Sequence, residues 1–243
     1  MINFLANLLT TASLFCGFVS VILSLENHFT FSAWAIILSV VFDGLDGQVA
    51  RLNPIPSGFG EELDSLVDVV SFGIAPSILG YVFIYKDFYA WAVTALFVYL
   101  VCSVFRLAKY NITPKEKMRN YFIGLPTTMS GGILASFILI YRKQDHLQIP
   151  EFMPGILSAR FTPIIFVVLV LLLAYLMVSR IRYLNLDGLK RFLGRKTIPA
   201  VLFLLSILVL AAFYRKAGIT LFTYFLIYLL FSPFVVKRLG TQK

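Results

Sequence analysis

Long apolar runs separated by short polar connections extend along this whole chain. A helix needs about 20 mostly apolar residues to cross a hydrocarbon core ~30 Å thick. Eight runs reach or nearly reach that length, and they lie at residues 3–25, 31–51, 60–84, 89–110, 125–141, 161–179, 198–213 and 218–236. The pattern predicts an all-α fold, a polytopic membrane helical bundle of about eight transmembrane helices.

Composition agrees with this prediction. Hydrophobic residues make up 59% of the 243 residues and charged residues only 14%, which is typical of a membrane protein rather than a globular domain. The net charge of +9 does not indicate nucleic acid as a partner, because the basic residues lie between the apolar runs. Cys16 and Cys102 each lie inside an apolar run, so no disulfide framework is expected. The first run lacks a basic segment before it and a cleavage site, and we interpret it as a retained span.

The distribution of lysine and arginine predicts the orientation of the chain. Of the 21 Lys and Arg residues, fifteen fall on the side of the membrane that holds Arg51, and six fall on the other side. Positively charged connections favour the cytoplasm. Both termini, and the loop at residues 52–59, are therefore expected on the cytoplasmic face.

Acidic residues are concentrated in one window of the chain. Six of the twelve lie between Asp43 and Asp68, within or beside apolar runs. An ionised aspartate at the centre of a membrane helix costs ~2.5–3.5 kcal/mol on insertion scales. Several such aspartates at regular spacing require compensation, and a divalent cation is a natural source of it.

Helical geometry places these aspartates on two facing surfaces. Asp43 and Asp46 share one face of their span, and Asp64 and Asp68 share one face of the next. Counted from the connecting loop, Asp43 and Asp68 lie about 12 Å deep, and Asp46 and Asp64 about 6–8 Å. The sequence therefore predicts two carboxylate layers at matched heights.

Such an all-oxygen site suits Mg²⁺ or Mn²⁺ and not zinc. Two ions would fit four carboxylates, and so would one ion with one protonated or catalytic aspartate.

The acidic window has two other interpretations. Solvated loop residues are disfavoured, because the run that leads to Asp43 is apolar up to it. Carboxylates lining the path of a cation transporter remain an alternative on physical grounds.

The window also resembles a known signature. The residues that carry the resemblance, in identity and spacing, are Asp43, Asp46, Gly47, Ala50, Arg51, Gly60, Asp64 and Asp68. They are similar to the signature of the CDP-alcohol phosphatidyltransferases. The resemblance implies that Asp43, Asp46 and Asp64 hold the divalent metal, while Asp68 shares metal binding with the role of general base. It further implies a set of CDP-binding residues, namely Asp46, Gly47, Ala50, Arg51, Ser57 and Gly60.

Three later segments resemble the phosphatidylserine synthase branch of that family. They read SFGIAP at 71–76, RLAKYN at 106–111 and FIGLP at 122–126. The chain departs from that branch mildly, for example at Lys109 and Tyr110, where Arg and Phe are common. The resemblance implies L-serine as the acceptor alcohol. The candidate acceptor-binding residues are Ser71, Arg106, Lys109 and Asn111.

The expected activity is thus transfer of the phosphatidyl group from CDP-diacylglycerol to the hydroxyl of L-serine, with release of CMP. Glycerol 3-phosphate or choline as acceptor, or an archaeal ether lipid as donor, are alternatives within the same chemistry. We expect a catalytic core at 1–140 and additional transmembrane helices of the same membrane domain at 141–243. The resemblance also implies a homodimer in the plasma membrane of a prokaryote, and the distribution of Lys and Arg predicts an active site that faces the cytoplasm.

Overall fold

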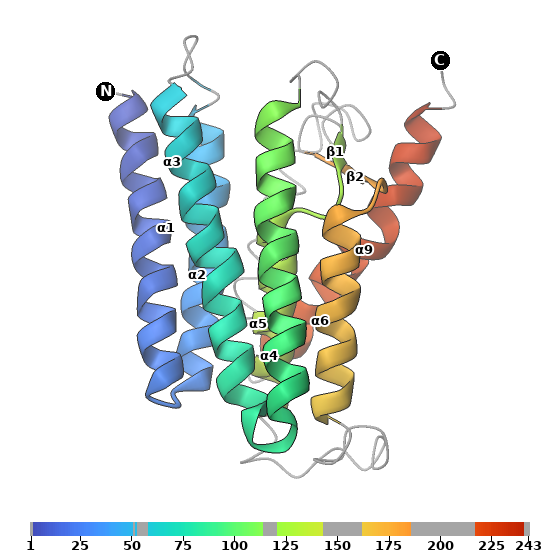
Figure 1. Cartoon of the computed structure of the whole chain (residues 1–243). Helices are drawn as coiled ribbons and strands as arrows, with labels where there is room; N and C mark the ends of the chain where they lie inside the picture. Colours follow the sequence, from blue (N-terminus) through green and yellow to red (C-terminus); the bar gives the residue numbers. More distant parts are fainter. Residues whose placement is uncertain are drawn as a thin grey trace.

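The computed structural model describes residues 2–50, 52, 58–113, 121–142, 162–185 and 217–240 (Figure 1). The elements in chain order are α1 (Ile2–Leu25), α2 (Phe29–Ala50), α3 (Gly58–Asp68), the π-helix η1 (Val69–Ile74), α4 (Ala75–Ile112), β1 (Tyr121–Ile123), α5 (Thr127–Arg142), α6 (Thr162–Val178), β2 (Arg182–Leu184) and α9 (Ala217–Gly240). The predicted all-α membrane fold is confirmed.

Five helical segments are long and apolar enough to cross a membrane, at Asn3–Leu25, Phe29–Ala50, Gly58–Ile84, Ala90–Ile112 and Ala217–Lys237. The apolar helices Thr127–Ile140 and Thr162–Val178 are shorter. These seven segments coincide with seven of the eight expected runs. The run at 198–213 lies outside the described residues, so the number eight stays a prediction.

Helices α1 and α2 form a tight hairpin joined by serine hydroxyls. Asn27 adopts a positive φ of 62° in the turn between them, a conformation that asparagine tolerates better than most residues. Buried hydroxyl pairs then link the two helices, Ser13 with Ser39 at 2.7 Å and Ser20 with Ser32 at 2.8 Å. In an apolar medium such pairs and small side chains hold helices closely together. They fix the register of α2, which carries two of the aspartates.

A π-helix follows directly after Asp68, at the junction of α3 and α4. Pro76, at the start of α4, has no N–H to donate to the carbonyl four residues earlier, which belongs to Phe72. The hydroxyl of Tyr99 donates to that carbonyl at 2.9 Å, and the ring of Tyr99 is fully buried. The third and fourth spans therefore lie side by side. Ser77 and the carbonyl of Leu96, 3.5 Å apart, make the same connection.

A small antiparallel sheet, not expected from the sequence, joins β1 to β2, with Phe122 opposite Tyr183. Helix α9 holds β2 in place through the backbone of Leu184. The N–H of Leu184 donates to the hydroxyl of Ser232, and the carbonyl of Leu184 accepts from the Tyr228 hydroxyl at 2.8 Å. Burial raises the pKa of Tyr183 to about 12, so this phenol stays neutral at physiological pH.

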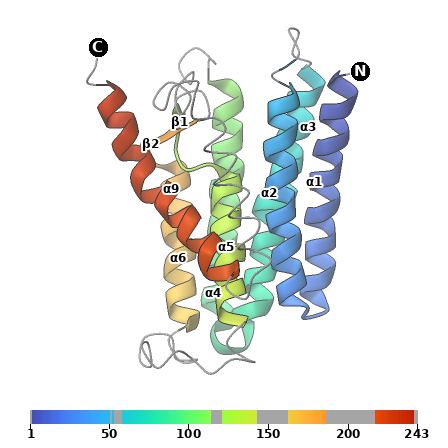
Figure 2. The ribbon, with the colours of Figure 1, turned by 180° about the vertical axis from the view of Figure 1, so that it is seen from behind.

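The helices surround one continuous apolar core, to which Ile36, Leu79, Leu134, Phe166 and Phe225 contribute from five different helices. Helices α1 to α3 lie on one side, α6 and α9 on the other, and α4 and α5 between them (Figure 1). Helix α9 runs obliquely across α5 (Figure 2). The start of α1, the end of α9 and the small sheet all lie at the same end of the bundle (Figure 1). Asp43 of α2 and Asp64 and Asp68 of α3 come together toward that end.

Candidate active site

Three carboxylates converge between α2 and α3. Asp43 comes from α2, and Asp64 and Asp68 come from one face of α3, because residues four apart are neighbours on a helix. Each offers an oxygen, and these oxygens all lie within 4.8 Å of one another. The carboxyl groups of Asp43 and Asp68 lie directly against each other. Like charges this close and this deep repel strongly, so the arrangement calls for a cation.

Asp46 adjoins this group without being part of it. Its side chain is 4% exposed and lies beside Thr10 of α1. The sequence predicted four carboxylates in two matched layers, whereas the structure brings three of them together and turns the fourth toward α1. The spacing within α2 places Asp46 on the same broad face as Asp43, but the close approach of α1 decides where its carboxylate points.

The residues present fit a divalent metal. Oδ1 of Asp68 and Oδ2 of Asp46 are buried and have no hydrogen-bond partner. Buried charged oxygens are normally satisfied, and leaving one unsatisfied costs at least ~1–3 kcal/mol. An oxygen-only donor set is what Mg²⁺ and Mn²⁺ prefer. The group can therefore hold such an ion, and the unsatisfied oxygens offer it ligands.

A buried arginine lies next to the acidic group. Arg106 of α4 is 9% exposed, and its Nη1 donates to the hydroxyl of Thr127 at 3.1 Å. That hydroxyl in turn donates to Oδ2 of Asp68 at 3.3 Å. The guanidinium also lies over the rings of Tyr110 and Phe122, 5.4 Å and 6.0 Å from their centroids. Its Nε has no hydrogen-bond partner, so this cation keeps a donor available.

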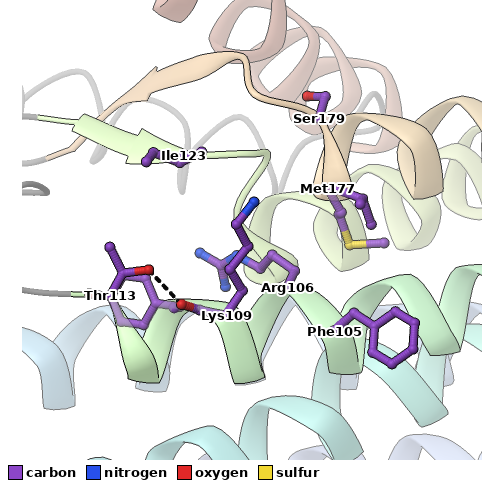
Figure 3. Close-up of a pocket in the computed structure, with 9 residues that line it drawn as sticks. Phe105, Arg106, Lys109, Thr113, Ile123, Met177 and Ser179 are labelled. Atoms are coloured by element: carbon purple, nitrogen blue, oxygen red, sulfur yellow. Dashed lines mark hydrogen bonds between the residues drawn. The ribbon is translucent and has the colours of Figure 1, made fainter.

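Arg106 and Lys109 line a small cavity of about 70 Å³ (Figure 3). Both side chains extend from α4 toward the segment that carries Ile123, and Met177 and Ser179 close the space from the end of α6. A water needs roughly 10–15 Å³ of such space, so the cavity takes about five waters. This volume suits a small molecule rather than a nucleotide, and Arg106 and Lys109 bring positive charge to its otherwise mostly apolar wall.

The other two candidate acceptor residues are not brought to this cavity. Ser71 is buried against α1, where its hydroxyl donates to the carbonyl of Ser13 at 3.2 Å. Asn111 is exposed and donates to the hydroxyl of Ser65 at 3.0 Å, which connects α4 to α3. Both residues lie in the expected segments, but on helix faces that point away from the cavity.

Those candidate CDP-binding residues that the structure describes lie at the end of the acidic site toward the connection of α2 and α3. A Cβ added to Gly47 would meet nothing within 4 Å, so open space adjoins this glycine. Ala50 is exposed at the end of α2, and Gly60 is half-buried in the first turn of α3. Arg51 and Ser57 lie outside the described residues, and their predicted roles stay predictions.

Sequence reasoning missed the residues that hold the wall of the cavity. Gly124 adopts a φ of +80°, and a side chain there would collide with the carbonyl of Met177. The N–H of Gly124 donates to Ile181 at 2.8 Å, and that of Leu125 donates to Leu176 at 3.0 Å. The Gly-Leu-Pro turn was visible in the sequence. Its partner segment at 176–181, far along the chain, carried no motif that could have revealed it.

Comparison with known proteins identifies the family of this chain. The family model of CDP-alcohol phosphatidyltransferase matches residues 3–234. A CDP-diacylglycerol–serine O-phosphatidyltransferase of Helicobacter pylori is 36% identical over 186 residues, which is 76% of this chain and 73% of that protein. A protein of the same name from Saccharomyces cerevisiae is 33% identical over 57% of this chain and 55% of its own length. An archaetidylserine synthase of Methanothermobacter thermautotrophicus is 30% identical over 76% and 71% of the two chains. Since the family match spans nearly the whole sequence, this protein belongs to the CDP-alcohol phosphatidyltransferase family.

Proposed function

We propose that the protein is an integral membrane enzyme that transfers the phosphatidyl group of CDP-diacylglycerol to the hydroxyl of L-serine and releases CMP. The observation that carries this proposal is the three-carboxylate group, joined through Thr127 to a buried arginine that lines a small cavity. The relatives named for serine transfer support the choice of acceptor.

The family depends on a divalent metal, and here Asp43, Asp64 and Asp68, with Asp46 beside them, would hold it. We propose Mg²⁺ or Mn²⁺, because every donor is an oxygen. When bound, such an ion would offset the negative charge that develops on the CMP leaving group. The acidic residues thereby also set the position of the pyrophosphate.

Asp68 is the proposed general base. It takes the proton of the serine hydroxyl while that oxygen attacks the phosphorus that carries the diacylglycerol. The new bond is serine oxygen to phosphorus, the bond from this phosphorus to the oxygen of CMP breaks, and CMP leaves with the electron pair. Oδ1 of Asp68, buried and without a partner, is the oxygen available for this role or for the ion.

Arg106 and Lys109 are the proposed acceptor-binding residues. A carboxylate in the cavity would neutralise the buried guanidinium and use its free donor. Binding there would leave the serine hydroxyl facing Asp68, since Thr127 already connects the two groups. Ser71 and Asn111 are not required by this arrangement.

The nucleotide is proposed to bind beside Gly47, with Asp46, Ala50, Arg51, Ser57 and Gly60 as its further contacts. Open space at Gly47 supports this placement, because a close approach of the nucleotide needs a position without a side chain. We further propose that the end of the bundle bearing this site faces the cytoplasm, and that the enzyme is a homodimer. The excess of Lys and Arg supports the orientation.

The relative named archaetidylserine synthase favours one alternative, the same transfer from an ether-lipid donor. The acidic group and the acceptor cavity would serve both donors equally. The two candidates therefore differ only in the lipid chains, which lie away from the reacting atoms.

The decisive experiment measures CMP release by the purified protein in detergent with Mg²⁺ or Mn²⁺. CDP-diacylglycerol and its ether-linked counterpart are each offered with serine, glycerol 3-phosphate or choline. We expect serine-dependent release of CMP. Release with another alcohol but not serine would reject the proposed acceptor. No release under any condition, together with ion uptake by proteoliposomes, would favour the transporter.

A further inference from the structure

Thr127 occupies the point where the acidic group and the acceptor cavity meet. It is the first residue of α5, directly after the Gly-Leu-Pro turn, and it is fully buried. It lies outside the family signature and outside the set of residues that the sequence singled out. Its hydroxyl is the connection between Arg106 and Asp68.

The donor and acceptor capacities of the three groups determine the direction of each hydrogen bond in this chain. A guanidinium can only donate and an ionised carboxylate can only accept, whereas a hydroxyl does both. Arg106 therefore donates to Thr127 at 3.1 Å, and Thr127 donates to Oδ2 of Asp68 at 3.3 Å. The hydroxyl uses its single proton on Asp68, and it cannot turn away without leaving a buried charge unpaired.

The intervening hydroxyl also keeps two opposite charges apart. Arg106 and Asp68 are both buried, and each retains one polar atom without a partner, Nε and Oδ1 respectively. A direct ion pair between buried groups of this kind would be strongly attractive and would use those atoms. With Thr127 between them, Oδ1 stays without a partner beside Asp43 and Asp64, and the Arg106 side chain stays at the wall of the acceptor cavity.

The backbone of Thr127 is held in place by a second buried network. The hydroxyl of Ser130 lies 2.8 Å from the carbonyl of Thr127 and 2.9 Å from the hydroxyl of Tyr99. Tyr99 in turn donates to Phe72 in the π-helix that follows Asp68. The two hydroxyl protons serve two of these three contacts at a time, and Ser130 and Tyr99 pack the first turn of α5 against the π-helix that follows Asp68.

We propose that Thr127 is a positioning residue that separates Arg106 from Asp68, so that Asp68 stays open to the metal and Arg106 to the carboxylate of the acceptor. The proposal rests on the function proposed above. Without the Thr127 hydroxyl, Arg106 moves onto Asp68, competes with the metal and no longer receives the acceptor.

The first test measures Mn²⁺ binding by electron paramagnetic resonance, without turnover, in purified full-length protein. Thr127→Val, which keeps the shape and removes the hydroxyl, should weaken Mn²⁺ binding about tenfold or more. Thr127→Ser should bind as wild type does. In an Arg106→Ala background, Thr127→Val should have no further effect, because the competing cation is gone. Thr94→Val is the matched control, since Thr94 is exposed and bonds within its own helix.

The second test is steady-state kinetics on the same variants. At saturating Mn²⁺, Thr127→Val should raise the serine KM about tenfold to 150-fold and leave the KM for CDP-diacylglycerol unchanged, with rescue by Thr127→Ser. A merely structural role predicts instead a lower unfolding temperature with both KM values unchanged. Should Thr127→Val fail to fold, Thr127→Ala takes its place.

Two outcomes overturn the proposal. One is wild-type Mn²⁺ affinity in folded Thr127→Val, and the other is an equal loss with and without Arg106. If wild-type protein uses another acceptor instead of serine, the proposed function fails, while the Mn²⁺ measurements still decide the role of Thr127.

Discussion

At the scale of single residues, the site is a set of buried charges that compensate one another only in part. Asp43, Asp64 and Asp68 share a small volume, and within the part of the chain that the structure describes, Arg106 is hydrogen-bonded to this group through Thr127. Oxygens of Asp46 and Asp68 remain without partners. In an apolar surrounding a divalent cation would compensate this arrangement, which makes each aspartate individually testable.

Asp64→Asn should reduce activity to background and weaken Mn²⁺ binding, because an amide is a neutral and poorer ligand for a hard cation. Asp43→Asn should do the same, and chelator should inactivate wild type until Mg²⁺ or Mn²⁺ is returned. Glu62→Gln is the control, since Glu62 is an exposed acidic residue of the same helix. CMP release and Mn²⁺ titration measure the effect. Activity of Asp64→Asn that persists in chelator would reject the metal site.

Arg106→Ala should raise the serine KM about tenfold to 150-fold, since a hydrogen bond to a charged group contributes roughly 1.5–3 kcal/mol. The KM for CDP-diacylglycerol should change little. Arg106→Lys should recover only part of the loss, because a point charge cannot reproduce the guanidinium fork. Initial rates over a range of serine concentrations measure this. A folded Arg106→Ala enzyme with a normal serine KM would exclude the acceptor pocket and leave Arg106 a structural cation.

At the scale of elements, the cavity depends on a turn and a strand pair at the end of the bundle. The turn at Gly124 rests on the segment after α6, and β1 pairs with β2, which α9 anchors through Leu184. Helices from the second half of the chain therefore shape a cavity whose charged residues come from the first half. The expected division into a core at 1–140 and additional helices at 141–243 stays a prediction.

Gly124→Ala should destabilise the protein and lower activity. A φ of +80° costs a residue with a Cβ roughly 1–2 kcal/mol, and the collision with the Met177 carbonyl adds to this. The unfolding temperature should fall by at least several degrees. Gly44→Ala is the matched control, because a Cβ at Gly44 meets nothing within 4 Å and alanine favours a helix. Thermal unfolding in detergent compares the two, and an unchanged midpoint for Gly124→Ala would contradict the described turn.

At the scale of the whole molecule, the bundle has two distinct ends. The acidic group lies toward the end that bears the small sheet, the start of α1 and the end of α9, and the α1–α2 turn lies at the opposite end (Figure 1). This polarity agrees with the distribution of Lys and Arg, which predicts the site end in the cytoplasm. Serine would then enter, and the water-soluble nucleotide product would leave, on the same side of the membrane.

Single cysteines should reveal this orientation in a background without Cys16 and Cys102. A cysteine at Ser57, in the connection of α2 and α3, should react with an impermeant thiol reagent only from the cytoplasmic side. One at Glu26, exposed in the α1–α2 turn, should react only from outside. Labelling of intact cells and of inverted vesicles measures both. Reaction of Ser57→Cys in intact cells would reverse the proposed orientation.

The sequence by itself determined the membrane-spanning helices, because length and hydropathy decide whether a segment can cross lipid. It also determined the acidic site in outline, since residues three or four apart share a helix face and a short connection sets their depth. Only the tertiary structure decided that three aspartates converge while Asp46 turns toward Thr10, and that Ser71 and Asn111 face away from the cavity. It alone brought Thr127 between Arg106 and Asp68, and the segment at 176–181 against Gly124. Such contacts join residues far apart in the chain, and they follow from how helices pack around one another, which no local pattern records.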